Sequence, residues 1–219
     1  MHRLLFEKTG NAVWISHLDL MRLFQRAFKR AGLSLTHTQG FNPRPSVSIA
    51  LPLSVGVESV CELLDFTLDG EMVPCEEICK RLNEALVPGV RVREVYDTGR
   101  KLKELAFLDC AITLEYDKVI SADAQVKLRE LFSAESLIVP KKGKNGIQDQ
   151  DIIPLIKNLE VIVAGEKELV LQARVCCQNP SLNPMQLVAA IGLHLSELRP
   201  DFAKCKRLET YDLNQEVFR

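Results

Sequence analysis

Most candidate functional residues of this sequence lie within Ser16–Glu58, and the first group consists of cations on a predicted helix. Arg22, Arg26, Lys29 and Arg30 recur at helical spacing and share one face, while apolar residues gather opposite. No acidic residue alternates with them, as it would in a face stabilised by ion pairs. Such a stripe suits RNA phosphates, which bind cations without sequence readout. The solvated face of an ordinary amphipathic helix carries the same charges, so both interpretations stay open.

A second group of candidate residues lies in the loop at residues 40–45. Gly40 permits a positive φ, and two prolines hold the residues before them extended. The loop would therefore be stiff and would present the Phe41 ring, the Asn42 amide and the Arg44 guanidinium, groups that stack on bases or bind phosphate. In the alternative, the loop is a rigid crossover with Phe41 in the core and Arg44 in solvent. Residues 51–59 form a further turn-rich stretch that could line the same groove.

Two histidines are the candidates for catalysis, if the protein is an enzyme. His17 lies in the first turn of the helix, on its core-facing side, where the positive end of the helix dipole favours a neutral imidazole. A neutral ring at His17 or His37 could act as a general base, with Arg44 steadying a phosphorane. That combination predicts a metal-independent ribonuclease. A histidine at such a position is otherwise a structural residue.

A third candidate for anion binding is the Lys/Gly-rich segment at residues 141–146. Lys141 and Lys142 would lie at the tip of a mobile hairpin or close over a polyanion. The order of glycine and lysine does not match the phosphate-binding P-loop.

Seven cysteines, an odd and scattered number, indicate reduced thiols and not a disulfide framework. Cys75 and Cys79 are four residues apart on a predicted helix and could share a metal. No second Cys or His pair follows nearby to complete a four-ligand site, so we expect this chain to bind no metal. A radical-SAM cluster motif, CxxxCxxC, would need a third cysteine where Leu82 stands, so the chain does not carry that cluster by itself.

Composition places the 219 residues among ordinary globular proteins, with 47% hydrophobic and 26% charged residues. No apolar run approaches the roughly 18 residues that span a bilayer, and Glu7 interrupts what would be the apolar region of a signal peptide. We therefore expect a cytoplasmic protein without a membrane contact. The first fifty residues hold seven basic and two acidic side chains, against 21 and 27 in the remainder, which favours an anionic partner for that end.

The order of predicted elements places these candidates in an α+β fold. The first half reads as strands at 4–6, 13–15, 33–38, 47–51, 61–68 and 90–96, with helices at 16–31 and 74–86. A helix begins at Ser16 because Ser16 and Asp19 form a capping box, and Gly32 suits its end. The second half repeats the rhythm with strands at 107–116, 136–140, 152–163, 169–176 and 206–213, and helices at 122–132 and 184–198. The order β-α-β-β-α-β predicts two tandem ferredoxin-like units, residues 1–100 and 106–219. One continuous α+β domain of unfamiliar topology is the alternative.

Four segments carry a resemblance to a known family: Phe6–Gly10, Ile15–Arg22, Gly40–Pro45 and Leu51–Ser59. Together they resemble the radical-SAM-associated protein family of unknown function, whose members are encoded beside, or fused to, cobalamin-binding radical-SAM proteins. The resemblance covers the whole chain and is specific over residues 1–65. The family has an Asp-Ile-Arg-Pro string in its second half, whereas this chain has Ile153 at the Arg position, which puts an anion-binding role there in doubt.

The resemblance implies a partner and not a reaction. The partner would be a radical-SAM protein that itself carries an iron–sulfur cluster, S-adenosylmethionine and cobalamin, and the setting would be RNA modification or ribosome-related processing. The tandem ferredoxin-like architecture also resembles CRISPR RNA-processing endonucleases. Three hypotheses follow: a non-catalytic RNA- or substrate-binding module, a metal-independent endoribonuclease, and a protein–protein adaptor. We favour the first because the histidines have no evident catalytic partner in the sequence.

Overall fold

A computed structural model describes residues 1–70, 72–143 and 146–219, which form two compact units. The first unit comprises Met1–Glu104 together with Arg219, and the second comprises Leu105–Phe218. Both combine antiparallel strands with helices, so the expected α+β class is confirmed. Within the described ranges, no helix has both the length and the apolar character needed to cross a bilayer.

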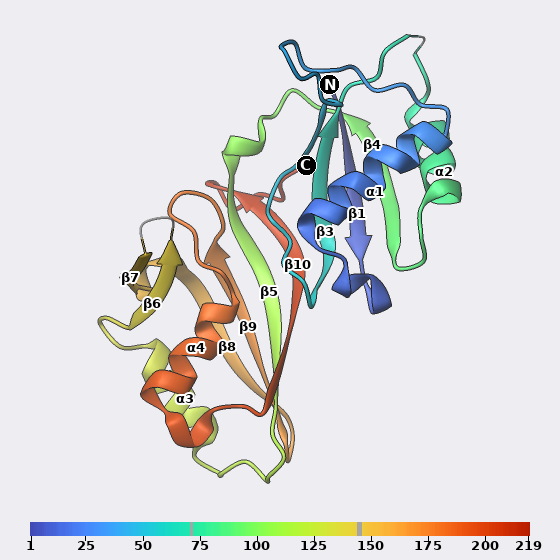
Figure 1. Ribbon diagram of the computed structural model, residues 1–219. Coiled ribbons are helices and arrows are strands. Elements are labelled where there is room, and N and C mark those ends of the chain that lie inside the picture. Colours follow the sequence, from blue (N-terminus) through green and yellow to red (C-terminus); the bar gives the residue numbers. More distant parts are fainter. Residues whose placement is uncertain (71, 144–145) are drawn as a thin grey trace. The chain divides into compact units, whose positions relative to one another are not determined.

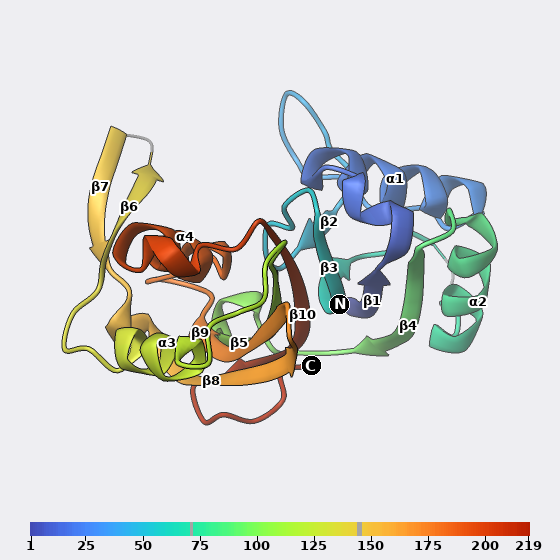
Figure 2. The same ribbon diagram turned by 90° about the horizontal axis from the view of Figure 1, so that it is seen from below.

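The first unit is an antiparallel sheet with two helices on one face (Figures 1 and 2). Its strands run in the order β4-β1-β3, with β2 paired to β3. The elements are β1 (His2–Lys8), the 3-10 helix η1 (Gly10–Trp14), α1 (His17–Arg30), β2 (Val47–Ile49), β3 (Val57–Phe66), α2 (Cys75–Ala85), β4 (Val90–Asp97) and the 3-10 helix η2 (Leu102–Glu104).

Aromatic pairs join α1 to the sheet. Phe24 on α1 meets Phe6 on β1 edge to face at 4.7 Å, and Phe28 lies 4.8 Å from Phe66 on β3. All four rings are buried, and such pairs contribute beyond the apolar area that they bury. The apolar face predicted for this helix is therefore its core face, and its opposite face is left at the surface.

The second unit has a four-stranded antiparallel sheet in the order β10-β5-β9-β8 and a separate hairpin, β6-β7 (Figure 1). Helix α3 packs against β8 and α4, and α4 also contacts β6. The elements are β5 (Leu105–Glu115), α3 (Ala124–Phe132), β6 (Ile138–Gly143), β7 (Gly146–Asp151), the 3-10 helix η3 (Ile153–Leu155), β8 (Ile156–Gly165), β9 (Glu168–Cys176), α4 (Met185–His194), the 3-10 helix η4 (Ser196–Leu198) and β10 (Phe202–Asp212).

Two strands predicted in the first unit are wrong. The segment at 13–15 belongs largely to η1, because the Lys8 ammonium donates hydrogen bonds to the carbonyls of Val13 and Ile15, both at 3.1 Å, and folds the chain back. The segment at 33–38 makes only isolated bridges, Leu35 to Leu68 and His37 to Pro45.

Three expectations for the second unit also need correction. Lys141 and Lys142 belong to β6, where their backbones pair with Gln148 and Ile147, and not to a loop; Lys144 lies outside the described residues. The strand expected near 136–140 is part of the separate β6-β7 hairpin, and the neighbour of β9 in the main sheet is β8. The helix expected at 184–198 ends at His194 and is followed by η4.

Candidate nucleic-acid interface

Helix α1 begins and ends where its sequence predicts. The Ser16 hydroxyl accepts a hydrogen bond from the Asp19 amide at 3.2 Å and donates one to the Asp19 carboxylate at 2.7 Å. The Ser16 hydroxyl and then the Arg22 guanidinium lower the pKa of Asp19 below its usual value. At the other end Gly32 takes a φ of +68°, the left-handed conformation that terminates helices. These ends fix which residues of α1 face outward.

The four cations on the outer face of α1 are all exposed, but they are not equivalent. Arg22 forms an ion pair with Asp19 at 3.1 Å, and Arg30 donates a 2.6 Å hydrogen bond to the carbonyl of Ala85, the last residue of α2. Among the described contacts, neither Arg26 nor Lys29 forms a hydrogen bond or an ion pair. Of the four predicted cations, Arg26 and Lys29 are therefore the ones whose side chains are best placed to bind a ligand.

Two further cations of the basic N-terminal segment are buried and unavailable to a ligand. Arg3 is 0% exposed and makes a two-pronged ion pair with Asp65, at 2.6 and 3.0 Å. Lys8 is also 0% exposed, and its ammonium donates a third hydrogen bond, of 3.3 Å, to the carbonyl of Ser54. Both serve to hold the first unit together, so counting charges along the sequence overstates its basic surface.

The loop at residues 40–45 is an exposed projection with a fixed base. The Thr38 amide donates to the Arg44 carbonyl at 2.8 Å, and the Arg44 amide donates to the Thr38 hydroxyl at 3.0 Å. Beyond this base the Phe41 ring is fully exposed, and Asn42 and the Arg44 side chain lie in solvent. The alternative in which Phe41 enters the core is wrong. A fully exposed ring with no packing role is available for stacking on a base.

A cleft of about 380 Å³ lies between the C-terminal half of α1 and the chain that follows it. Its floor is apolar, and its polar groups are the Gln25 amide, the Lys29 ammonium, the Ser34 hydroxyl and the His37 imidazole. Two predicted residues, Lys29 and His37, thus line one cavity, whereas Arg22, Arg26, Arg30, Arg44 and His17 do not. Residues 51–59, expected at the same groove, do not line it either.

The cleft also contains residues that sequence reasoning missed. Gln25 precedes Lys29 by one helical turn, so its place beside Lys29 follows from helical spacing. Ser34 carries no comparable signal, because its position depends on how the chain turns after Gly32.

His17 is separate from the cleft. It is half-buried in the first turn of α1, and its Nδ1 atom is buried with no hydrogen-bond partner among the described residues. Of the three residues predicted for catalysis, His37 lines the cleft, and His17 and Arg44 do not.

Of the two lysines predicted for anion binding in the second unit, Lys141 has a structural contact. Lys141 is half-buried and donates a 3.0 Å hydrogen bond to the Ser181 carbonyl. Lys142 is described only through its backbone.

Asp151 belongs to the string in which Ile153 replaces the family's Arg. Its carboxylate accepts hydrogen bonds from the amides of Leu137 and Ile153 at 3.0 and 3.1 Å. Asp151 therefore shapes the backbone at the end of the hairpin.

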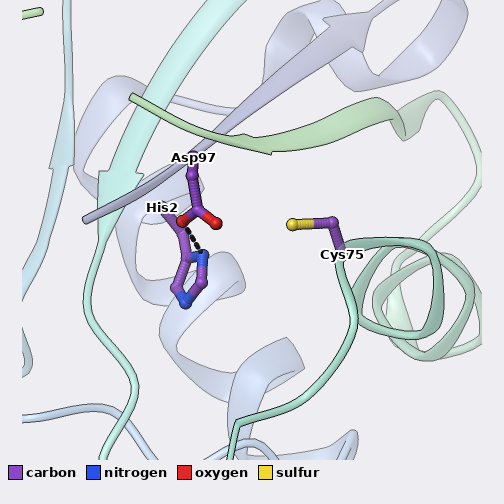
Figure 3. Close-up of side chains that lie close together, drawn as sticks. All are labelled: His2, Cys75 and Asp97. Atoms are coloured by element: carbon purple, nitrogen blue, oxygen red, sulfur yellow. Dashed lines mark ion pairs between the residues drawn. The ribbon is translucent and has the colours of Figure 1, made fainter. Parts of the chain in front are cut away.

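Within the part of the chain that the structure describes, His2, Cys75 and Asp97 of the first unit lie close enough together to hold a metal ion (Figure 3). Cys79, paired with Cys75 in the sequence prediction, is not among them. Its thiol contacts the carbonyl of Val92 and the amide of Asn83. Burial, followed by the Asp97 charge, raises the pKa of Cys75.

Fold and surface together define a mixed α+β protein with antiparallel sheets and a small polar cleft beside one basic helix. Residues 2–184 match a family described as an uncharacterized protein conserved in bacteria (DUF2344), and the chain belongs to that family. That description names no radical-SAM enzyme, so the partner implied by the resemblance stays a hypothesis. No curated protein matches the chain.

Two solved structures share the fold at low sequence identity. One chain from a Cbf5-Nop10-Gar1 complex aligns with a TM-score of 0.51 and 9% identity, over 95% of this chain and 48% of that one. One chain from an H/ACA RNP bound to a substrate RNA containing 2'-deoxyuridine aligns with a TM-score of 0.50 and 8% identity, over 96% of this chain and 46% of that one. This chain therefore spans about half the length of the solved chains that it matches.

Proposed function

We propose that this protein is a non-catalytic RNA-binding module that presents RNA to a radical-SAM enzyme on another chain. The setting would be RNA modification or ribosome-related processing. The observation that carries the RNA-binding proposal is the cleft lined by Lys29 and His37, together with the exposed cations Arg26 and Arg44. The exposed ring of Phe41 supports single-stranded RNA as the ligand, because unpaired bases stack on aromatic side chains.

The solved neighbours add weaker support. One of them belongs to a complex bound to a substrate RNA. Its identity to this chain is 8%, so the likeness concerns the fold, and the proposal depends on the surface residues named above.

Salt dependence tests the RNA-binding proposal. Titration of single-stranded RNA by fluorescence anisotropy should give an affinity that falls with salt, and the double variant Arg26→Ala with Lys29→Ala should bind more weakly. Because each phosphate contact contributes about 0.7 to the slope of log K against log salt for single strands, the variant should lose roughly 1.4 from that slope. A matched control, Lys80→Ala, removes an exposed cation from α2 and should change neither quantity. Absence of affinity for any RNA at low salt would leave the adaptor hypothesis as the better one.

The proposed partner requires its own experiment. Tagged protein should co-purify a radical-SAM protein that absorbs as an iron–sulfur and cobalamin enzyme. Nuclease treatment distinguishes the two links between the chains: loss of the partner after treatment indicates that RNA bridges them, and retention indicates direct contact.

A second candidate function, RNA cleavage, is favoured only by the presence of an imidazole, His37, and a cation, Lys29, in the lining of one cleft. Incubation with total RNA in EDTA decides between the two functions. Cleavage that disappears in His37→Ala supports the ribonuclease, and intact RNA supports the binding module.

We further propose that both units are ferredoxin-like. Two observations support this architecture once the β6-β7 hairpin is regarded as an insertion. The strand orders in the sheet are β4-β1-β3-β2 and β10-β5-β9-β8. Along the chain, a helix follows the first and the third strand of each unit. An experimental structure of either unit tests the strand order.

A further inference from the structure

We propose that His2, Cys75 and Asp97 bind a divalent metal ion, with Zn²⁺ as the preferred ion. Each residue offers one ligand atom, and these atoms all lie within 4.8 Å of one another. In Figure 3 the Cys75 sulfur points toward the Asp97 carboxylate, which in turn contacts the His2 ring. The site is independent of the cleft and of the proposed RNA binding.

Three ordered elements bring the ligands together. His2 begins β1 and Asp97 ends β4, and the two residues lie directly opposite each other in the antiparallel pair. Opposite residues on one face of a sheet have Cβ atoms about 4.5–5.5 Å apart, so their side chains meet. Cys75 is the first residue of α2. The His2 ring also lies 5.3 Å from the ring of Phe66, which fixes its orientation. The ligand positions are therefore set by the fold before any metal arrives.

The polar contacts within the cluster are incomplete without a cation. His2 Nδ1 lies 2.8 Å from an Asp97 oxygen, but the two atoms are not aligned for a hydrogen bond, and Nδ1 is buried with no hydrogen-bond partner among the described residues. The Cys75 sulfur faces the same carboxylate, and its ligand atom lies within 4.8 Å of those of His2 and Asp97 (Figure 3). A divalent cation would accept the Nδ1 lone pair, stabilise the thiolate and neutralise the carboxylate.

The chemical types of the three ligand atoms determine which metal ion the site would prefer. Imidazole, thiolate and carboxylate together suit Zn²⁺, whereas Mg²⁺ and Ca²⁺ prefer oxygen ligands only. Zinc bonds of about 2.0–2.3 Å place the ligands of a tetrahedral site roughly 3.3–3.6 Å apart, so small rotations of the exposed Asp97 side chain would close the cluster around the ion. Three protein ligands leave a fourth position open for water or another donor.

Cobalt substitution tests the site, because Co²⁺ replaces Zn²⁺ in tetrahedral sites and gives a sulfur-to-metal charge-transfer band. The full chain, stripped with EDTA, should bind one Co²⁺ with that band, and added Zn²⁺ should displace it. Cys75→Ser should abolish the band and weaken Zn²⁺ binding by more than the roughly 10–100-fold that loss of an outer hydrogen-bond partner costs. Asp97→Asn, on an exposed side chain, should weaken binding and keep the band.

The matched control is Cys79→Ser, one turn further along α2 and outside the cluster. It removes a thiol and should leave the stoichiometry, the band and the affinity unchanged. Equal losses in the two serine variants, or no stoichiometric binding by a folded wild-type protein, would overturn the proposal. Circular dichroism of each variant shows whether it has folded. If Cys75→Ser does not fold, Asp97→Asn and the direct binding measurement still decide.

Discussion

Arg30 on α1 donates a 2.6 Å hydrogen bond to the carbonyl of Ala85, the last residue of α2, and this contact joins the ends of the two helices. The last carbonyls of a helix have no partner within the helix, and a basic side chain satisfies one of them. A cation that looks available for RNA therefore has a structural role.

Arg30→Ala should lower stability more than it lowers RNA affinity. Loss of one hydrogen bond to a charged donor at the surface should cost about 0.5–1.5 kcal/mol in urea unfolding. RNA affinity should fall less than it does in Arg26→Ala, because the Arg26 guanidinium forms no hydrogen bond or ion pair among the described contacts. A larger loss of RNA affinity in Arg30→Ala than in Arg26→Ala would indicate that Arg30 contacts RNA.

Phe41→Ala should lower RNA affinity and leave stability almost unchanged. The ring is fully exposed, so the free energy of unfolding should change by less than about 0.5 kcal/mol. Loss of base stacking should cost about 1–3 kcal/mol of RNA binding energy, measured by anisotropy. Phe202→Ala, at a 52% exposed ring in the second unit, is the matched control and should bind RNA normally. Equal binding by both variants would exclude stacking on Phe41.

Lys8→Met should destabilise the first unit although it keeps an unbranched chain close to the length of the lysine stem. The ammonium donates to three carbonyls, on Val13, Ile15 and Ser54, and the substitution leaves them without that donor. We expect a cost of about 2–3 kcal/mol in urea unfolding, typical of leaving buried polar groups unsatisfied. Lys80→Met, at an exposed lysine, should cost nothing measurable. A tolerated Lys8→Met would mean that water replaces the ammonium.

Acid should weaken the contribution of Asp151 to stability. Its backbone hydrogen bonds, from Leu137 first and also from Ile153, lower its pKa below the usual 3.8. A group with a depressed folded-state pKa stabilises the fold above its unfolded pKa, and that contribution is lost as the pH falls through the folded-state value. Asp151→Asn should therefore lower the melting temperature at pH 6 and have a smaller effect near pH 3. Equal losses of melting temperature at the two pH values would contradict this role for the Asp151 carboxylate.

Zinc should stabilise the wild-type protein and not the Cys75→Ser variant. A ligand that binds only the folded state at one hundred times its Kd adds about 2.7 kcal/mol to the free energy of unfolding. Urea unfolding with and without Zn²⁺ measures this difference, and EDTA should reverse it. Cys79→Ser should respond to zinc as the wild-type protein does.

The local features of the molecule could be predicted from the amino-acid sequence. It predicted α1 from Ser16 to Gly32, because the capping box and the terminating glycine act through hydrogen bonds only a few residues away. It also predicted a stiff loop at Phe41 and an α+β class, since periodicity and turn chemistry are local signals.

Which charged side chains are buried, and which distant side chains meet, depends on long-range packing and could not be predicted from the sequence. Arg3 and Asp65 are 62 residues apart, and His2 and Asp97 become neighbours only through the pairing of β1 with β4. A cation count cannot reveal that Lys8 is buried, because its three acceptors are backbone carbonyls that every residue possesses. The cluster of His2, Cys75 and Asp97 could not be predicted from the sequence either. Strand register fixes its geometry, and register depends on the packing of the whole sheet.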